Sequence, residues 1–395
     1  MFPIEVYVLG HTQDFFQAKK GWSLLKDQIF DYYLEPYTAK ILNTGKPLTI
    51  VDCFAGKGKF DDGAEGSPLI IARHIKKTLA SKKQNKQIFG IFIEKKYHQE
   101  LTNNIAGFHN CSVWPGTFED NLSKLLQLSF SNNLFIYIDP YGIKSLDFRR
   151  LSELKQKKFY TLEMLINFNS IGFLREACRL LKYEGIFQSF DNLDDYEIDA
   201  SNNIENMKKI ANGDYWIPIV KELRDRKIRM LDAEERFVKG YISQIESLFC
   251  YVVNIPIKQK TVNVPKYRLI FGTNNQDGLI LMADNMNKKW KKILEDKRGG
   301  QLVLFEYDFP DLSLVNGFDL EEDIITNLKE QVGSMLLKDL IVKLIQKYGI
   351  SFSETHYKNM IKKMPVRIDR KPEFTPTGKK ATSMDYNNYK IQVSL

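Results

Sequence analysis

IVDCFAGKGKF, residues 50–60, joins a buried-strand signal to two closely spaced glycines. The apolar run ends at Asp52. Gly56 and Gly58 follow, where the backbone can turn sharply and a bulky ligand can lie against it. The stretch therefore predicts a cofactor cradle at the end of a strand. It is neither a phosphate-binding P-loop, because no Gly-Lys-Ser/Thr follows at the required spacing, nor a Gly-x-Gly-x-x-Gly motif.

Short apolar runs alternate with helical patterns around this stretch. An N-terminal helix or helix pair is predicted over residues 15–42, and helices are predicted to start near Ser67, Lys96, Phe118 and Leu146. Between them, strands are predicted at KPLTIVDCF (46–54), QIFGIFIE (87–94), CSVW (111–114), NLFIYID (133–139) and TLEMLINFN (161–169). Such alternation indicates crossover units and a mainly parallel sheet, so the fold class is α/β and Rossmann-like.

The domain organisation changes after residue 169. Helices rich in charge suggest an insertion over about 170–248, and two more strands follow at 249–257 and 266–273, joined by a short loop containing Pro265 that favours an antiparallel pair. Glycines at 299 and 300 mark a break. We predict a helical segment at 1–45, a Rossmann domain at 46–300 and a small domain at 315–395.

Composition sets the general class of the protein. The chain has 395 residues, of which 43% are hydrophobic and 27% charged, as in globular proteins. With no long apolar run and no secretory signal pattern, we expect a cytoplasmic protein that does not contact membranes. The four cysteines lie far apart, and no histidine has zinc-ligand spacing, which predicts free thiols and no protein-bound metal.

Positive charge is concentrated in the last 65 residues. Of a net charge of +8, an excess of seven comes from residues 331–395, which hold 12 Lys/Arg and 5 Asp/Glu. Three predicted helices and two β segments there suggest a winged helix-turn-helix domain that binds DNA or RNA. The alternatives are a solvated lysine-rich surface or a capping domain without a ligand. The predicted contacts are Lys358, Lys362, Lys363, Arg367 and Arg370.

Two further strand ends carry acidic residues. Glu94 ends the second strand, where an acidic residue can accept hydrogen bonds from ribose hydroxyls. The fourth strand ends in Asp139-Pro140-Tyr141. There a carboxylate can hold a target amine while an aromatic ring stacks on a base, and positioning of this kind supplies most of the catalysis of methyl transfer. The alternative for the latter motif is a β-turn whose proline ends the strand.

Five ordered blocks resemble the three-Cys-motif partner (TcmP) family over roughly residues 15–295. The blocks are IVDCFAGKGKFDDGAEGSPLI, IFIEKKY, YIDPYGIK, the stretch from LINFN to Arg175, and RLIFGTNNQDGLILMADNM. The family resembles class I methyltransferases dependent on S-adenosylmethionine. It takes its name from a partner protein that bears three cysteines and resembles a radical-SAM enzyme.

The resemblance implies which residues bind the cofactor. They comprise Asp52, Phe54, Ala55, Gly56 and Gly58 on the methionine part, Glu94 on the ribose, and Thr117 with Phe118 near the adenine. Lys57 stands where the family commonly has proline, and it could pair with the cofactor carboxylate or favour another anionic ligand. Thr117 replaces an acidic residue, and Asp-Pro-Tyr is one residue shorter than the Asp-Pro-Pro-Tyr of amino-methyltransferases.

Three functional hypotheses follow. The first is a methyltransferase that acts on nucleic acid, with the basic C-terminal domain holding the polymer and a three-cysteine protein as partner. The second is a catalytically silent binding module that serves this partner in a mobile-element or phage-related system. The third is an enzyme that methylates a small molecule.

Overall fold

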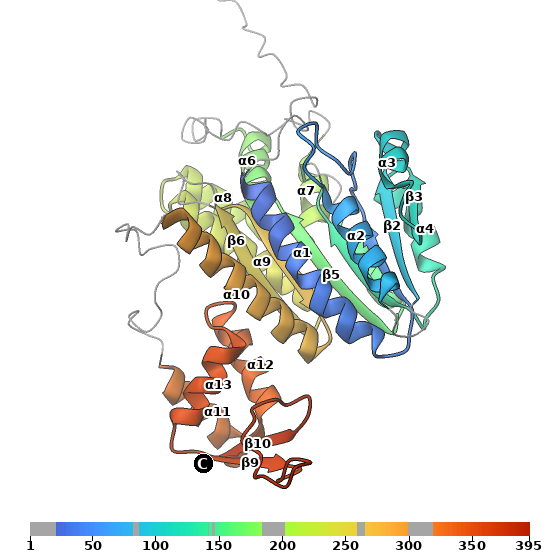
Figure 1. Ribbon diagram of the computed structural model, residues 1–395. Helices are drawn as coiled ribbons and strands as arrows, with labels where there is room; N and C mark the ends of the chain where they lie inside the picture. The colour runs from blue at the N-terminus through green and yellow to red at the C-terminus, as the bar shows by residue number, and fades with distance from the viewer. Residues whose placement is uncertain are drawn as a thin grey trace, which may run out of the picture. The chain divides into compact units, whose positions relative to one another are not determined.

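The computed structural model of the chain describes residues 21–81, 87–140, 142–143, 147–183, 202–258, 265–298 and 319–395. They divide into two compact units (Figure 1). The first is drawn from Met1–Cys250 with Ile255–Asn274, and the second from Tyr251–Asn254 with Asn275–Leu395.

A seven-stranded sheet in the order β3-β2-β1-β4-β5-β7-β6 organises the fold. Its strands are β1 Leu48–Asp52, β2 Ile88–Glu94, β3 Cys111–Pro115, β4 Asn133–Ile138, β5 Thr161–Phe168, β6 Tyr251–Lys258 and β7 Pro265–Thr273. Strands β1 to β5 pair in parallel, whereas β7 runs antiparallel to β5. This order confirms the predicted Rossmann-like α/β fold of the class I methyltransferase type.

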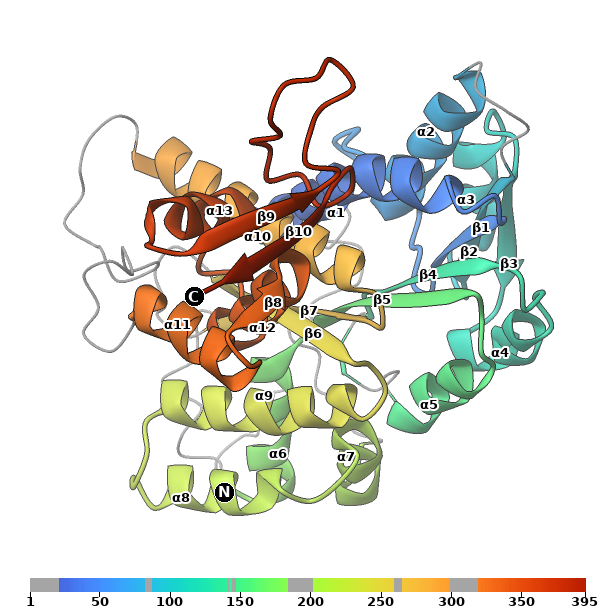
Figure 2. The same cartoon turned by 90° about the horizontal axis from the view of Figure 1, so that it is seen from below.

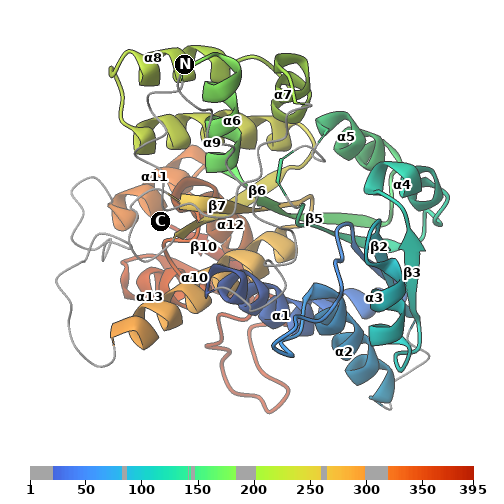
Figure 3. The same ribbon diagram turned by 90° about the horizontal axis from the view of Figure 1, so that it is seen from above.

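Helices cover both faces of the sheet (Figure 3). One face carries α1 Gly21–Leu42, α2 Ser67–Ala80 and α3 His98–Ile105; the other carries α4 Phe118–Leu126, α5 Phe148–Gln156, α6 Ser170–Leu180 and α9 Met230–Glu246. Helices α7 Ile204–Ala211 and α8 Trp216–Arg224 contact α6. Every residue of the central strands β1 and β4 is buried. This double cover explains their unbroken apolar runs.

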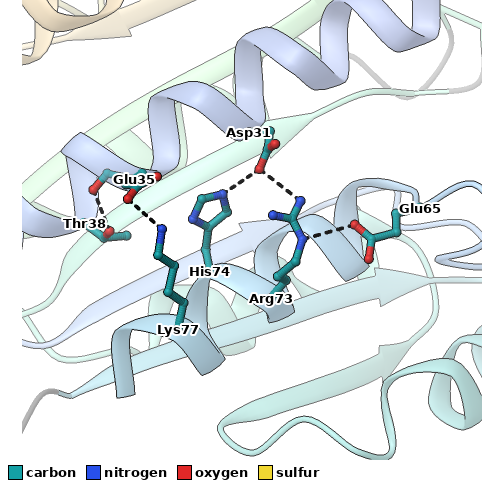
Figure 4. Close-up of polar contacts among 7 residues, drawn as sticks. All are labelled: Asp31, Glu35, Thr38, Glu65, Arg73, His74 and Lys77. Atoms are coloured by element: carbon teal, nitrogen blue, oxygen red, sulfur yellow. Dashed lines mark hydrogen bonds and ion pairs between the residues drawn. The ribbon is translucent and has the colours of Figure 1, made fainter. Parts of the chain in front are cut away.

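Helix α1 is fixed by two kinds of contact. On its buried side, the Phe30 ring stacks on Tyr137 of β4 with ring centroids 4.4 Å apart. On its other side, Asp31 accepts a hydrogen bond from the guanidinium of Arg73 and bonds the His74 imidazole at 2.7 Å (Figure 4). One turn later a second ion pair joins the same two helices, between Glu35 and a lysine of α2.

Several predicted boundaries were wrong. Pro265 is the first residue of β7 and not part of a loop, a position that proline tolerates because it need not donate to the ladder. Helix α7 was not predicted, although Asn203 caps it and Asn212 ends it in the left-handed conformation with φ 52°. In the C-terminal region, residues 334–336 form a strand, although a helix was predicted to begin at Met335.

The second unit contains the basic C-terminal region. It includes α10 Gln276–Arg298, α11 Leu320–Glu330, β8 Ser334–Leu336, α12 Leu337–Tyr348, α13 Glu354–Lys363, β9 Arg367–Lys371 and β10 Lys390–Ser394. The three strands form an antiparallel sheet in the order β8-β10-β9. Ser353 is a good helix-capping residue in the sequence, and it caps α13 by accepting a hydrogen bond from the His356 amide at 3.2 Å. Figure 2 shows the long loop between β9 and β10.

No helix within the described ranges is both long enough and apolar enough to span a bilayer.

A buried glutamate ties α1 to the sheet. Glu163 of β5 is 2% exposed and accepts hydrogen bonds from the hydroxyls of Tyr33 at 2.7 Å and Thr273 at 3.1 Å. Burial raises the pKa of Glu163 to about 7, against the opposing effect of the two hydroxyls. The carboxyl therefore joins three elements, α1, β5 and β7, and its burial favours the protonated form.

Glu163→Gln should remove part of the pH dependence of stability. Between its ordinary value of 4.5 and about 7, the native carboxyl keeps a proton that the unfolded chain has released, so this group's contribution falls as the pH rises. Relative to the unmodified protein, the variant should gain about 3 kcal/mol of unfolding free energy between pH 4.5 and pH 8. Urea unfolding across this range measures the difference, and parallel curves would contradict the assignment.

Candidate functional site

The end of β1 is the point from which the site is built. Strand β1 lies between β2 and β4, and beyond it the chain still bonds to both neighbours. The Cys53 amide donates to the Tyr137 carbonyl of β4, and the Ala55 amide donates to the Ile93 carbonyl of β2, each at 3.0 Å. Successive connections leave to opposite sides here, so this is the switch point at which open α/β sheets bind ligands.

The loop after β1 turns on glycines. Gly56 and Gly58 have φ of 61° and 76°, in the region that favours glycine. A Cβ atom on Gly58 would lie 2.7 Å from a methyl group of Leu101. The chain then forms a small hairpin over 59–65 and returns, with the Gly66 amide donating to the Gly58 carbonyl at 2.9 Å. This hairpin lengthens the connection between β1 and α2.

Glu94 joins the glycine turn to the second strand. Its Oε2 accepts a hydrogen bond from the Gly56 amide at 2.8 Å, while Oε1 accepts from the amides of Lys96 at 2.7 Å and Tyr97 at 3.0 Å. A carboxylate has about four lone-pair sites, two on each oxygen. The remaining site on Oε2, the atom that holds the glycine turn, can accept a hydroxyl of a ligand.

Asp52 is the buried acid of the site. It is fully buried, and its Oδ1 accepts the Phe54 amide at 3.2 Å. Oδ2 makes no hydrogen bond of standard geometry with any described residue, although the nearby Ser67 hydroxyl favours the charged form. Burial raises the pKa of Asp52 to about 7, and the negative charge of Asp139 adds to the rise. Near neutral pH this carboxyl can therefore donate or accept a hydrogen bond.

The residues predicted near the adenine have structural roles. Thr117 caps α4, since its hydroxyl accepts the Asp120 amide at 3.1 Å and its own amide donates to the Asp120 carboxylate at 2.9 Å. Phe118 is buried, and its ring centroid lies 6.4 Å from that of Phe54. The preceding glycine, at position 116, donates its amide to the Glu94 carbonyl at 3.2 Å, so this turn lies beside the end of β2.

Lys57 lies over the glycine turn. Its ammonium group is 3.6 Å from the Asp61 carboxylate and 5.2 Å from the centroid of the Tyr97 ring. Its carbonyl accepts a hydrogen bond from the Asn104 amide group at 2.8 Å. The backbone of Lys57 is therefore held by α3, and its cation is already near one carboxylate.

Asp139 belongs to a cluster that the sequence did not reveal. One carboxylate oxygen, Oδ2, pairs with the ammonium of Lys26 from α1 and lies 3.4 Å from the Tyr137 hydroxyl. The other, Oδ1, accepts the Asn167 side-chain amide of β5 at 2.7 Å. Asn167 is 4% exposed, and its own carbonyl oxygen has no hydrogen-bond partner among the described residues.

Three acidic side chains act on the cation of this cluster. Burial disfavours the cation of Lys26, but attraction from Asp139, Asp27 and Asp52 outweighs this and raises its pKa. Lys26 is therefore a buried cation among three acidic groups.

The structure brings most of the predicted residues to one sheet edge. Asp52 and Glu94 come from paired strands, and Asp139 interacts electrostatically with Asp52. Pro140 is buried directly after Asp139, whereas Tyr141 lies outside the described residues. Lys26, Asn167 and Tyr137 were missed. For Asn167 the signal was a polar residue at the end of an apolar strand, but Lys26 is 113 positions from its partner.

The five predicted nucleic-acid contacts differ in their surroundings. Lys358 pairs with the glutamate one turn earlier at 2.6 Å, and Arg367 pairs with the aspartate two residues later at 2.9 Å. Arg370 donates to three backbone carbonyls. Lys362 and Lys363 are exposed at the end of α13. Lys362 and Lys363 are therefore the most available to a polyanion, whereas the guanidinium of Arg370 already donates to the backbone.

Lys26→Met should destabilise the protein by about 2–4 kcal/mol, because it leaves the carboxylate of Asp139 partly buried without its cation. Urea unfolding measures the change. Lys77→Met is the matched control, since it breaks an exposed pair with Glu35 on the neighbouring helix and should cost less than about 1 kcal/mol. Combining Lys26→Met with Asp139→Asn should cost less than the sum of the single changes. Additive losses would show that the pair is not coupled.

The chain was compared with known proteins. No protein-family model matches it, and no curated protein matches it. Among solved structures, a DUF519 protein from Legionella pneumophila aligns with 13% identity and a TM-score of 0.37, covering 74% of this chain and 95% of that one. Human methyltransferase-like protein 13, in complex with SAH, aligns with 10% identity and a TM-score of 0.32, covering 68% and 92%. The O-methyltransferase TomG from Streptomyces achromogenes, in complex with SAM, aligns with 8% identity and a TM-score of 0.30, covering 67% and 94%.

Proposed function

We propose that the protein is an S-adenosylmethionine-dependent methyltransferase that acts on nucleic acid together with a three-cysteine partner protein. The observation that carries the proposal is the hydrogen bond from the Gly56 amide to Glu94 Oε2. It makes the glycine turn and the acidic strand end one continuous binding surface beside the switch point of the sheet.

The residues present fit such a cofactor. Glu94 keeps one acceptor site for a ribose hydroxyl, and Gly56 presents backbone without a side chain. Asp52 has a buried oxygen, Oδ2, that makes no hydrogen bond of standard geometry among the described residues. The ammonium group of the cofactor could donate a hydrogen bond to this oxygen. Phe54, Ala55, Lys57 and Gly58 complete the proposed methionine site, and Thr117 with Phe118 completes the adenine side. S-adenosylmethionine, when bound, supplies an electrophilic methyl group.

Asp139 would position the acceptor. Three of its roughly four lone-pair sites are used by Lys26, Tyr137 and Asn167, and one site remains on Oδ1. Lys26 and Asn167 hold the carboxylate in one orientation, so an amine that donates to Oδ1 would meet it already in place. Pro140 and Tyr141 complete the proposed acceptor site. Orientation of this kind lowers the barrier without a further chemical group.

Support for a polymeric acceptor comes from charge. The second unit contains the residues that give the chain most of its excess of lysine and arginine, and its helices with a three-stranded antiparallel sheet suit a winged helix-turn-helix. The three-cysteine partner rests on the sequence resemblance. A cytoplasmic location is part of the same proposal.

A silent binding module is the second candidate. Both oxygens of Asp139 are already engaged, and Thr117 serves as a helix cap in place of an acidic adenine contact. A module that binds the cofactor without turnover would show S-adenosylmethionine binding but no transfer of labelled methyl groups to DNA, RNA or the partner. Transfer to any of them decides for the enzyme.

Calorimetry with S-adenosylmethionine tests the cofactor site. Glu94→Gln should weaken binding by about tenfold or more, because both carboxylate oxygens accept hydrogen bonds and the glutamine amide has only one accepting oxygen. Glu100→Gln, an exposed change on the adjacent α3, is the control and should bind as the unmodified protein does. No detectable binding by the unmodified chain, or equal binding by both variants, would refute the proposal.

A further inference from the structure

The loop between β9 and β10, together with the two strand residues that flank it, carries four lysines and only two acidic residues. They are Lys371, Lys379, Lys380 and Lys390, and all four are exposed. Lys371 and Lys390 lie directly opposite each other in the antiparallel register of β9 and β10. Like charges in such positions destabilise a strand pair. The protein therefore keeps a locally unfavourable arrangement of cations on its surface.

The part of this loop that carries the lysines is ordered by its own backbone. Phe374 and Lys380 form an antiparallel bridge, the Ala381 amide donates to the Glu373 carbonyl at 2.8 Å, and the Thr375 amide donates to the Lys379 carbonyl at 2.8 Å. We call residues 371–381 together with Lys390 the lysine hairpin. Its cations are displayed on a preformed turn, so little ordering would be required when a ligand binds.

Arg370 anchors the returning chain. Its guanidinium donates to the carbonyls of Thr382 and Ser383, at 3.3 and 2.7 Å, and to that of Ile368 at 3.1 Å. This arginine was predicted to contact nucleic acid. Its bonds instead fix the position of the lysine hairpin relative to β9.

An exposed aromatic ring lies opposite one of these cations. Phe374 is 54% exposed, and its bridge partner is Lys380. The nearest acids along the chain are few: Glu373 is exposed beside it, while Asp369 pairs with Arg367 and Asp385 is bonded by two asparagines. A ring that stacks on bases, surrounded by lysines that contact phosphates, is the combination that binds single strands.

We propose that the lysine hairpin binds single-stranded or locally unpaired nucleic acid, with Phe374 stacking on an exposed base and the four lysines contacting the backbone phosphates. The inference rests on the proposed function in that it names the form of nucleic acid that the second unit holds. Binding would relieve the repulsion between Lys371 and Lys390, which no residue of the described chain offsets by a direct ion pair in the structure.

The test uses the full chain and fluorescently labelled oligonucleotides, single-stranded and duplex, without S-adenosylmethionine. Lys390→Glu places an acid opposite Lys371. It should leave the thermal midpoint unchanged or higher, yet weaken single-strand binding and reduce the slope of log affinity against log salt by about 0.7 or more. Phe374→Ala should weaken binding by about 5- to 100-fold.

Two matched variants control for general effects. Lys329→Glu removes an exposed lysine of α11 in the same unit, and Phe130→Ala removes a ring that is 65% exposed in the first unit. Both should bind as the unmodified protein does. Tighter binding of the duplex, or unchanged binding by Lys390→Glu or Phe374→Ala, would overturn the inference. Because no cofactor is present, either outcome is independent of the test of the S-adenosylmethionine site.

Discussion

The divergence of backbone hydrogen bonds after β1 is the constraint on which the site depends. Cys53 bonds to β4 and Ala55 to β2, and the chain leaves the sheet directly after Ala55. It turns there through Gly56 and Gly58, whose positive φ angles are in the region that favours glycine. The bond from the Gly56 amide to Glu94 then closes the turn onto β2. The end of β1, the glycine turn and the end of β2 are therefore joined by hydrogen bonds into one local structure.

The sequence was sufficient for those parts of the fold that are encoded locally. The strand ending at Asp52, the strand ending at Glu94 and the cap at Ser353 follow from apolar runs, glycines and capping residues that lie side by side in the chain. The short strand β8 was missed because three residues between two helices carry no period of their own. Pro265 was misplaced because a proline at the first position of a strand looks, in sequence, like a loop residue.

The surroundings of Asp139 could not be predicted in the same way. Asp139 is visible as a carboxylate at a strand end, but its state depends on Lys26, which α1 delivers from a distant part of the sequence. Nothing in the periodicity of α1 distinguishes this lysine from a solvated one. What brings it there is the stacking of Phe30 on Tyr137, one helical turn further along α1, so an aromatic packing contact places the cation. Without Lys26, Asp139 would be only a carboxylate in a turn before proline.

The concentration of positive charge locates the cations available to a ligand less closely than the strand register does. The excess of lysine and arginine in the last 65 residues identified a region, but it gave equal weight to Arg370, which holds backbone carbonyls, and to lysines that face solvent. The pairing of β9 with β10 separates the two, because it sets Lys371 against Lys390 across one rung of the ladder. Two lysines opposite each other destabilise a small sheet. An acid at either position would have formed a favourable pair instead, so the retained lysines are informative. Because the register fixes both lysines on one rung, it identifies where the cations are concentrated more closely than the net charge of the region does.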